Sequence, residues 1–344
     1  MRNSAVRCAH ASNLEIAIFS GDFVPAGGAL PWRRQDGAPQ GRKGEKNLFS
    51  INYHKHNFGN TMKVQYLGTG AAEGVPAVFC NCEYCRGLRA RMEAGRAGRE
   101  VRSRSQVILD GELSIDFPPD AYSHSLAYGV DLSAVKYLLV THSHMDHFYA
   151  HDFILRGYKY AHEMTEPLLT IFGNAEVCSV FREDTRREMK DSVAPNIGLR
   201  TVGAYQELAF EDWRAYTFPA QHSSKEPLLY LIERGGKRVL HLTDTGKLPD
   251  ESIDFLKALK KRVDLITLDC TFLWDKTEPN ARHMGLDEVS CTVGKLERAG
   301  VADENTKKVI THFSHNSSPT MEAVARAERE FGFIAAYDGM TLEI

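Results

Sequence analysis

The segment 141–147 reads THSHMDH and constrains this chain more than any other part of its sequence. It follows the apolar run 137–140, which predicts a short buried strand. Within this segment, four metal-ligating side chains fall in six positions, which is far denser than isolated surface or core histidines would be. Residues two apart in an extended backbone project to the same side, so His142 and His144 share one ligand face. Asp146 and His147 are then free to face a second cation, so the segment predicts a two-metal site.

Further ligand-type residues follow later predicted strands. His222 comes after the run 213–219, Asp244 comes directly after 238–243, and His312 directly after 308–311. A single Asp after a strand is most often a turn or cap residue, so each position carries little weight alone. Their repeated placement at strand ends indicates one shared site.

Composition sets broad limits on the class of protein. With 344 residues, 43% of them hydrophobic, the chain is long enough to bury one large α/β core. A net charge of −3 gives no support for a duplex nucleic-acid partner, which usually requires a strongly basic face. No stretch approaches the about 18 consecutive apolar residues of a membrane span, and the run 16–19 is too short for a signal peptide. We therefore expect a cytoplasmic protein without a membrane partner.

The chain divides into two parts. Residues 1–61 are rich in Gly, Pro, Arg and Asn without sustained periodicity, so we expect a disordered or non-native extension, with Met62 as an alternative start. Residues 62–344 form the predicted hydrolase domain. Short apolar runs there predict strands at 63–67, 106–109, 113–116, 137–140, 168–173, 213–219, 228–233, 238–243, 265–269 and 308–311. Helical spacing predicts helices at 250–261, 286–299 and 319–331, the last with Pro319 in its first turn.

The H-x-H-x-D-H pattern resembles the signature of metallo-β-lactamase-fold hydrolases. The resemblance implies an αβ/βα four-layer sandwich, in which two mixed β-sheets face each other and helices lie outside. It also implies seven ligands for two divalent cations, either manganese or zinc: His142, His144 and His222 for one, Asp146, His147 and His312 for the other, and Asp244 between them. Two such cations, about 3.5–4 Å apart, share a bridging hydroxide nucleophile and clamp the oxygens of a phosphoryl centre.

A second cluster lies in the segment 80–85, CNCEYC. Seven cysteines in all, three of them so close together, argue against a disulfide framework and favour metal binding. Structural zinc commonly takes three Cys and one His, so Cys80, Cys82 and Cys85 need a fourth ligand, for which His315 is the best candidate. The alternative is that these residues are reduced loop thiols or small buried hydrophobes.

Two branches of the resembled superfamily carry this C-x-C-x-x-C element. One is the PhnP-like cyclic-phosphate phosphodiesterase type, which pairs the cysteines with the last His of T-H-x-S-H, as in the segment 311–315. The other is the pyrroloquinoline-quinone biosynthesis B type, which departs from the hydrolase ligand set. Because all seven catalytic ligands are present here, the first branch fits better. It implies hydrolysis of a small cyclic phosphate, such as a cyclic ribose phosphate or cyclic nucleotide, by a homodimer.

Two alternatives stay open beside this interpretation. A tRNA 3′-end endoribonuclease shares the ligand set and the Asp-Thr pair at 244–245, although no Gly- and Pro-rich arm follows the catalytic turn. A carrier of the quinone-biosynthesis B type would hold the thiol-bound zinc without two catalytic metals.

Two further features receive different interpretations. His283 resembles the histidine that precedes the late helix in the phosphodiesterase family and acts there as proton donor; a solvent-exposed histidine at a helix start is the alternative. The arginine-rich stretch 86–104 is more often a solvated face than a substrate contact, so we leave it out of the predicted site.

Overall fold

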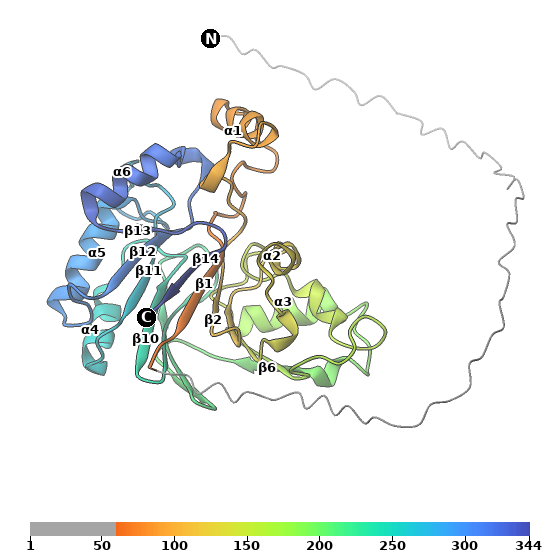
Figure 1. Cartoon of the computed structure of the whole chain (residues 1–344). Helices are drawn as coiled ribbons and strands as arrows, with labels where there is room; N and C mark the ends of the chain where they lie inside the picture. Colours follow the sequence, from red (N-terminus) through yellow and green to blue (C-terminus); the bar gives the residue numbers. More distant parts are fainter. Residues whose placement is uncertain (1–59) are drawn as a thin grey trace, which may run out of the picture. The chain divides into compact units, whose positions relative to one another are not determined.

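A computed structural model of the chain describes residues 60–344, which form two β-sheets with helices on their outer faces (Figure 1). The predicted extension 1–61 lies, apart from its last two residues, outside the described part of the chain. Met62 is buried, and its backbone N–H donates to the carbonyl of Ile344 at 3.0 Å.

The first sheet has seven strands in the order β14-β1-β2-β3-β4-β5-β6. It combines antiparallel pairs around β1 with parallel pairs from β3 to β6, so it is a mixed sheet. Its strands are β1 (Lys63–Gly68), β2 (Gln106–Leu109), β3 (Leu113–Ile115), β4 (Tyr137–Leu139), β5 (Leu169–Gly173), β6 (Ile197–Thr201) and β14 (Met340–Glu343).

The second sheet also has seven strands, in the order β13-β12-β11-β10-β9-β8-β7. Here β10 to β13 are parallel, whereas β7 to β10 form an antiparallel meander. Its strands are β7 (Glu207–Phe210), β8 (Trp213–Pro219), β9 (Leu228–Arg234), β10 (Lys237–Leu242), β11 (Leu265–Asp269), β12 (Lys307–Thr311) and β13 (Ile334–Ala335).

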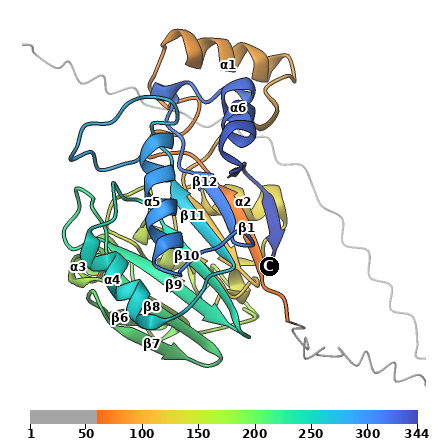
Figure 2. The ribbon, with the colours of Figure 1, turned by 90° about the vertical axis from the view of Figure 1, so that its left-hand side faces the viewer.

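Helices connect these strands and cover both sheets. The α-helices are α1 (Glu83–Glu93), α2 (Ala121–Tyr128), α3 (Ala175–Thr185), α4 (Asp250–Leu259), α5 (Leu286–Arg298) and α6 (Met321–Phe331). Short 3₁₀ turns are η1 (Gly98–Glu100), η2 (Leu132–Ala134), η3 (Ala150–Leu155), η4 (Ala194–Asn196) and η5 (His315–Ser317). Figures 1 and 2 show α4, α5 and α6 side by side against the second sheet, while α1 stands out beyond the end of the strands.

Alternating side chains build the four layers. In β4, Tyr137 and Leu139 face the core between the sheets, and Leu138 packs outward, together with Val140 directly after the strand. Side chains of a strand alternate between its two faces, so one short apolar run serves two cores. The outer core of the second sheet is larger, because α4, α5 and α6 all contribute to it. This arrangement is the αβ/βα sandwich that the sequence predicted.

Most predicted boundaries are confirmed to within two residues, with two corrections. Helix α6 begins after Thr320, whose hydroxyl accepts from the N–H of Ala323 at 3.1 Å, so Pro319 precedes the cap and does not lie in the first turn. The predicted strand 113–116 ends at Ile115, because Asp116 takes a left-handed φ of 62° and turns the chain away.

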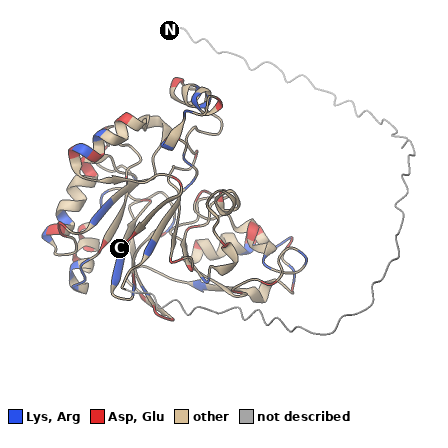
Figure 3. Ribbon diagram, in the orientation of Figure 1, with Lys and Arg blue, Asp and Glu red and all other residues tan. Residues whose placement is uncertain are grey.

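Helices α5 and α6 carry charges of both signs (Figure 3). In α5, acidic residues lie in the first turn and basic residues in the last turn, whereas in α6 the two signs alternate along the helix. Within residues 60–344, no helix combines the length and apolar character that crossing a membrane requires.

Candidate active site and metal centres

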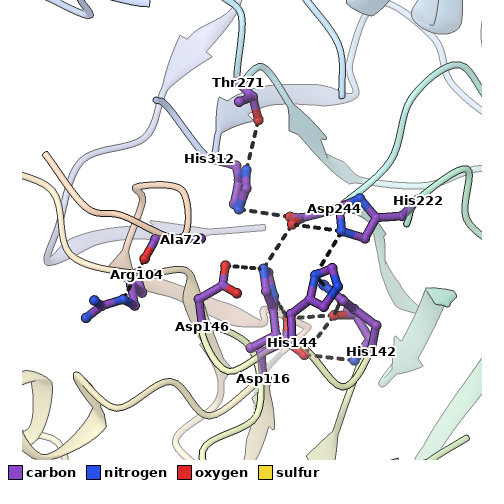
Figure 4. Close-up of polar contacts among 12 residues, drawn as sticks. Ala72, Arg104, Asp116, His142, His144, Asp146, His222, Asp244, Thr271 and His312 are labelled. Carbon is purple, nitrogen blue, oxygen red and sulfur yellow. Dashed lines mark hydrogen bonds and ion pairs between the residues drawn. The ribbon is translucent and has the colours of Figure 1, made fainter. Parts of the chain in front are cut away.

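The predicted ligands lie in loops that follow four strand ends at one edge of the two facing sheets. The turn after β4 supplies residues 142–147, and the loops after β8, β10 and β12 supply His222, Asp244 and His312. Because the two sheets face each other, loops that are distant in sequence meet above the inter-sheet core (Figure 4).

Three imidazoles form the first ligand group. Nε2 of His142 lies 3.0 Å from Nδ1 of His144, and Nε2 of His222 lies 3.2 Å from the same atom. Two nitrogen ligands on one tetrahedral zinc ion are separated by about 3.3 Å. The observed spacing therefore fits a single cation. Burial, followed by the neighbouring His147, holds the pKa of His142 well below its usual range, which favours the neutral form that ligates metal.

The second group combines carboxylates and imidazoles. Asp244 lies 3.0 Å from Nε2 of His147 through one carboxylate oxygen and 3.0 Å from Nε2 of His312 through the other. Asp146 is 3.2 Å from Nε2 of His147. The ligating atoms of all four residues lie within 4.8 Å of one another, and all four residues are buried.

Asp244 also reaches the first group. Its Oδ2 lies 4.0 Å from Nε2 of His222, so one carboxylate borders both sets of ligands. Despite the short distances, Nε2 of His147, Nε2 of His312 and one oxygen of Asp244 make no well-formed hydrogen bond. Buried polar atoms without partners are costly, and a cation among them would satisfy all three. The residues present therefore fit two divalent cations.

The far side of the second group is fixed by Asp116, which the sequence prediction missed. Its carboxylate lies 2.7 Å from Nδ1 of His147 and accepts from the backbone N–H of Thr141 at 2.8 Å. A carboxylate behind a ligating imidazole fixes its tautomer and directs the other ring nitrogen at the metal. A signal existed in the sequence, since Asp116 is the last residue of the predicted strand 113–116, much as Asp244 directly follows the predicted strand 238–243.

His283 lies beside both ligand groups. Its ring stacks on that of His312, with centroids 5.4 Å apart, and meets the edge of His222 at 4.9 Å. Nδ1 of His283 lies 2.7 Å from a carboxylate oxygen of the fully buried Asp269. Burial opposes charge on this imidazole, but the Asp269 carboxylate outweighs burial and raises the pKa of His283 to about 9. The imidazolium form is therefore favoured near neutral pH.

Asp269 and Thr271 support the rings of His283 and His312 through hydrogen bonds, and the sequence prediction included neither residue. Asp269 accepts from the backbone N–H of Thr271 at 3.1 Å and from its hydroxyl at 2.9 Å. The Thr271 hydroxyl is in turn 2.9 Å from Nδ1 of His312. His312 itself adopts a left-handed φ of 65°, a conformation that costs a non-glycine residue about 1–2 kcal/mol. The support thus holds a ligand in a strained backbone conformation.

The cysteine group lies at the base of α1. Sγ of Cys82 and Sγ of Cys85 lie 3.8 and 3.5 Å from Nδ1 of His315, and Cys80 completes the group. A thiolate and an imidazole on one tetrahedral zinc ion are about 3.6 Å apart. The N–H of Cys85, followed by His315, lowers the pKa of Cys82 to about 6, which favours thiolate. The structure thus brings together the four residues that the sequence proposed for a structural zinc.

Both catalytic ligand groups and His283 line or border one hollow of about 300 Å³, a volume at the lower end of the range of small-molecule sites. Glu73, Ser223, Phe272 and Asn316 contribute to its wall. Elsewhere in residues 60–344, hollows of about 210 and 460 Å³ contain none of the metal-ligating groups. The metal-ligating residues therefore identify the hollow of about 300 Å³ as the candidate active-site pocket.

The fold and the paired ligand groups define a protein of the metal-dependent hydrolase class. Residues 114–313 match the family model of the β-lactamase superfamily domain, and the chain belongs to this family. The family's fold implies binding of divalent metal, which agrees with the ligand groups described above.

Two curated proteins are similar to this chain in sequence. Coenzyme PQQ synthesis protein B of Methylorubrum extorquens is 24% identical over 82% of this chain and 100% of that protein. An octanoyltransferase of Porphyromonas gingivalis is 24% identical over 74% of this chain, which spans only 46% of that protein's length.

Solved structures share the fold at low identity. A diphosphatase of the PhnP family superposes with a TM-score of 0.62 at 22% identity, covering 83% of this chain and 97% of the other. Zinc-bound PqqB from Methylobacterium extorquens gives 0.57 at 18% identity, covering 82% and 100%. The short form of human tRNase Z gives 0.55 at 16% identity, covering 81% and 98%. These likenesses show the shared fold.

Proposed function

We propose that this protein is a phosphodiesterase that hydrolyses a small cyclic phosphate, such as a cyclic ribose phosphate or a cyclic nucleotide. The observation that carries the proposal is Asp244, whose two carboxylate oxygens border a three-histidine group and a mixed His-Asp group. A ligand set of this kind suits two divalent cations. The pocket of about 300 Å³ suits a small substrate.

The residues divide the work of hydrolysis. His142, His144 and His222 would hold one cation, Asp146, His147 and His312 the other, with Asp244 between them. When bound, the two cations polarise the phosphoryl oxygens and activate water for attack. Attack adds one water oxygen to phosphorus and breaks one P–O bond to the sugar. The departing sugar oxygen then needs a proton, and we assign its donation to His283, which Asp269 holds at 2.7 Å.

Two other functions compete with this proposal. The tRNA 3′-end endoribonuclease shares the fold, but in this chain no arm interrupts the segment from the catalytic turn to η3, and α5 and α6 carry mixed charges. A carrier of the quinone-biosynthesis B type gains support from relatives that match over their full length. The complete seven-residue ligand set favours the enzyme over the carrier.

Metal analysis and a substrate panel separate these functions. We expect about three metal ions per chain for the hydrolase, whereas the carrier predicts one. The metal-loaded protein should hydrolyse a 2′,3′-cyclic nucleotide and leave pre-tRNA uncut in the same buffer. Cleavage of pre-tRNA with no turnover of cyclic phosphates would support the nuclease and refute the proposal.

Replacement of His283 by alanine tests its role as proton donor. We expect kcat to fall by about 100- to 10,000-fold for a cyclic nucleotide, whose alkoxide leaving group needs a proton. For bis(4-nitrophenyl) phosphate, whose phenolate leaves without one, the loss should stay below about tenfold. His162→Ala, in the loop after η3, serves as the matched control and should leave both rates unchanged. An equal loss on both substrates would show that His283 supports the site without acting as its acid.

A further inference from the structure

We infer that the active-site pocket selects cyclic phosphodiesters that carry no second phosphate group, and that the carboxylate of Glu73 enforces this selectivity. The inference rests on the proposed function and deepens it by naming the substrate class. It follows from the charges that surround the pocket beyond the metal ligands.

Among residues 60–344, no Lys or Arg lines the pocket. Apart from its imidazoles, the pocket therefore depends on bound metal for positive charge. Proteins that bind a peripheral phosphate normally offer Arg or Lys side chains or the N-terminus of a helix. A substrate with one phosphodiester has its charge matched at the metals, whereas a second phosphate would lack a partner.

The arginine-rich stretch 86–104 does not supply that partner. Arg104 contacts the pocket residue Ala72, but through a hydrogen bond from its Nε to the Ala72 carbonyl at 2.7 Å, and its guanidinium pairs with Asp120 at 3.0 Å (Figure 4). Arg102 is buried, donating to Thr69 at 2.8 Å and to the carbonyl of Ala336 at 2.6 Å. Both guanidinium groups thus already make hydrogen bonds within the protein.

The helix beside His283 also offers no anion site. At the start of α5, the backbone N–H of Gly285 donates to the side chain of Glu288 at 3.1 Å. Asp287 lies in the same first turn. These carboxylates occupy the positive end of the helix dipole, where a phosphate would otherwise bind.

Glu73 adds a negative charge to the pocket wall. Its Oε1 accepts from the hydroxyl of Ser314 at 2.6 Å, and about 30% of the side chain stays exposed. Ser314 lies between the ligands His312 and His315 in the same loop, so the carboxylate is fixed beside the metal groups. A carboxylate accepts a hydrogen bond from a sugar hydroxyl but repels a phosphate at the same place. The pocket therefore discriminates between a hydroxyl and a phosphate on otherwise identical substrates.

Glu73 also lies near His315, so the experiment must distinguish an effect on that residue from an effect on substrate selectivity. Its Oε1 lies 3.8 Å from Nε2 of His315, on the far side of the ring from the nitrogen that faces the cysteines. A purely supporting role behind a zinc ligand would affect zinc retention and slow every substrate alike. A role in selectivity would change the ratio between substrates.

The test uses adenosine 2′,3′-cyclic phosphate with either a 5′-hydroxyl or a 5′-phosphate, and the full-length metal-loaded protein. We expect kcat/KM to be at least about tenfold higher for the 5′-hydroxyl compound. Glu73→Gln should narrow this ratio about tenfold by raising kcat/KM for the 5′-phosphate compound. Glu93→Gln, an exposed carboxylate at the end of α1, is the matched control and should leave the ratio unchanged.

The outcomes are distinguishable. Equal turnover of both compounds by the wild-type protein overturns the selectivity. An unchanged ratio in Glu73→Gln, accompanied by zinc loss and equal slowing, assigns Glu73 to support of His315 and overturns its proposed role. If neither cyclic compound is hydrolysed, the proposed function itself fails, and the inference fails with it.

Discussion

Replacement of Asp244 by asparagine should reduce hydrolysis of cyclic phosphates by about a thousandfold or more. Asp244 borders both ligand groups, at 3.0 Å from His147 and His312 and 4.0 Å from His222. Asparagine keeps the shape but loses the negative charge and one of the two ligating oxygens. Two-metal sites contribute several kcal/mol of transition-state stabilisation, and each 1.36 kcal/mol changes the rate about tenfold.

The measurement combines steady-state rates with elemental analysis of bound metal. Asp254→Asn, an exposed carboxylate on α4, controls for loss of a charge elsewhere. Circular dichroism and the midpoint of thermal unfolding establish that the variant is folded. His142→Ala provides an independent removal of one ligand, so the assignment stays testable if Asp244→Asn folds poorly. Activity within tenfold of wild type in either folded variant would contradict the assignment of these ligands.

Replacement of Cys85 by serine should remove one zinc ion per chain and loosen the segment around α1. The apolar core of this segment is small, since its buried members are Val75, Leu88 and Ala97. With so little burial, the segment depends on metal for stability, and loss of a structural zinc removes several kcal/mol of stability. Proteolysis within residues 80–100 should accelerate by at least about a hundredfold, because cleavage follows the population of the open form.

The matched control is Cys291→Ser, which changes an exposed thiol on α5. We also expect Cys85→Ser to lower kcat about tenfold, since His315 and His312 share one short loop and the ordering of one affects the other. Unchanged zinc content and unchanged proteolysis would show that these cysteines are ordinary reduced thiols.

The local pattern of apolar and turn residues was sufficient to predict much of the fold. Strands such as 106–109 and 213–219 were predicted to the residue, because each is an apolar run bounded by turn residues. The segment 148–200 was harder to interpret. Its helix α3 follows the cap residue Asn174, whose side chain accepts from the N–H of Val177 at 2.9 Å, and its strand β6 is half exposed at a sheet edge. Apolar periodicity is present in both elements but is short: Val177, Val180 and Phe181 in α3, and Ile197 and Leu199 in β6.

The candidate site was also predicted only in part. The sequence pattern located every residue of the two ligand groups, because metal-ligating residue types are recognisable at strand ends. Asp116 and Asp269 escaped notice, because their role depends on which imidazole the folded chain places in front of each carboxylate. The neutralisation of Arg104 by Asp120 is likewise a tertiary contact, and no spacing rule would have paired them.

Both kinds of metal site take a ligand from the loop 312–315, which follows all the other ligands of both sites in the sequence. In addition, β1 pairs along one edge with β14, so Lys63 has no strand partner on that edge until Glu343 has been made. A ribosome makes the cysteines and the histidine-rich turn long before it makes these partners. A chain stalled before residue 312 would therefore hold an incomplete ligand set at both centres.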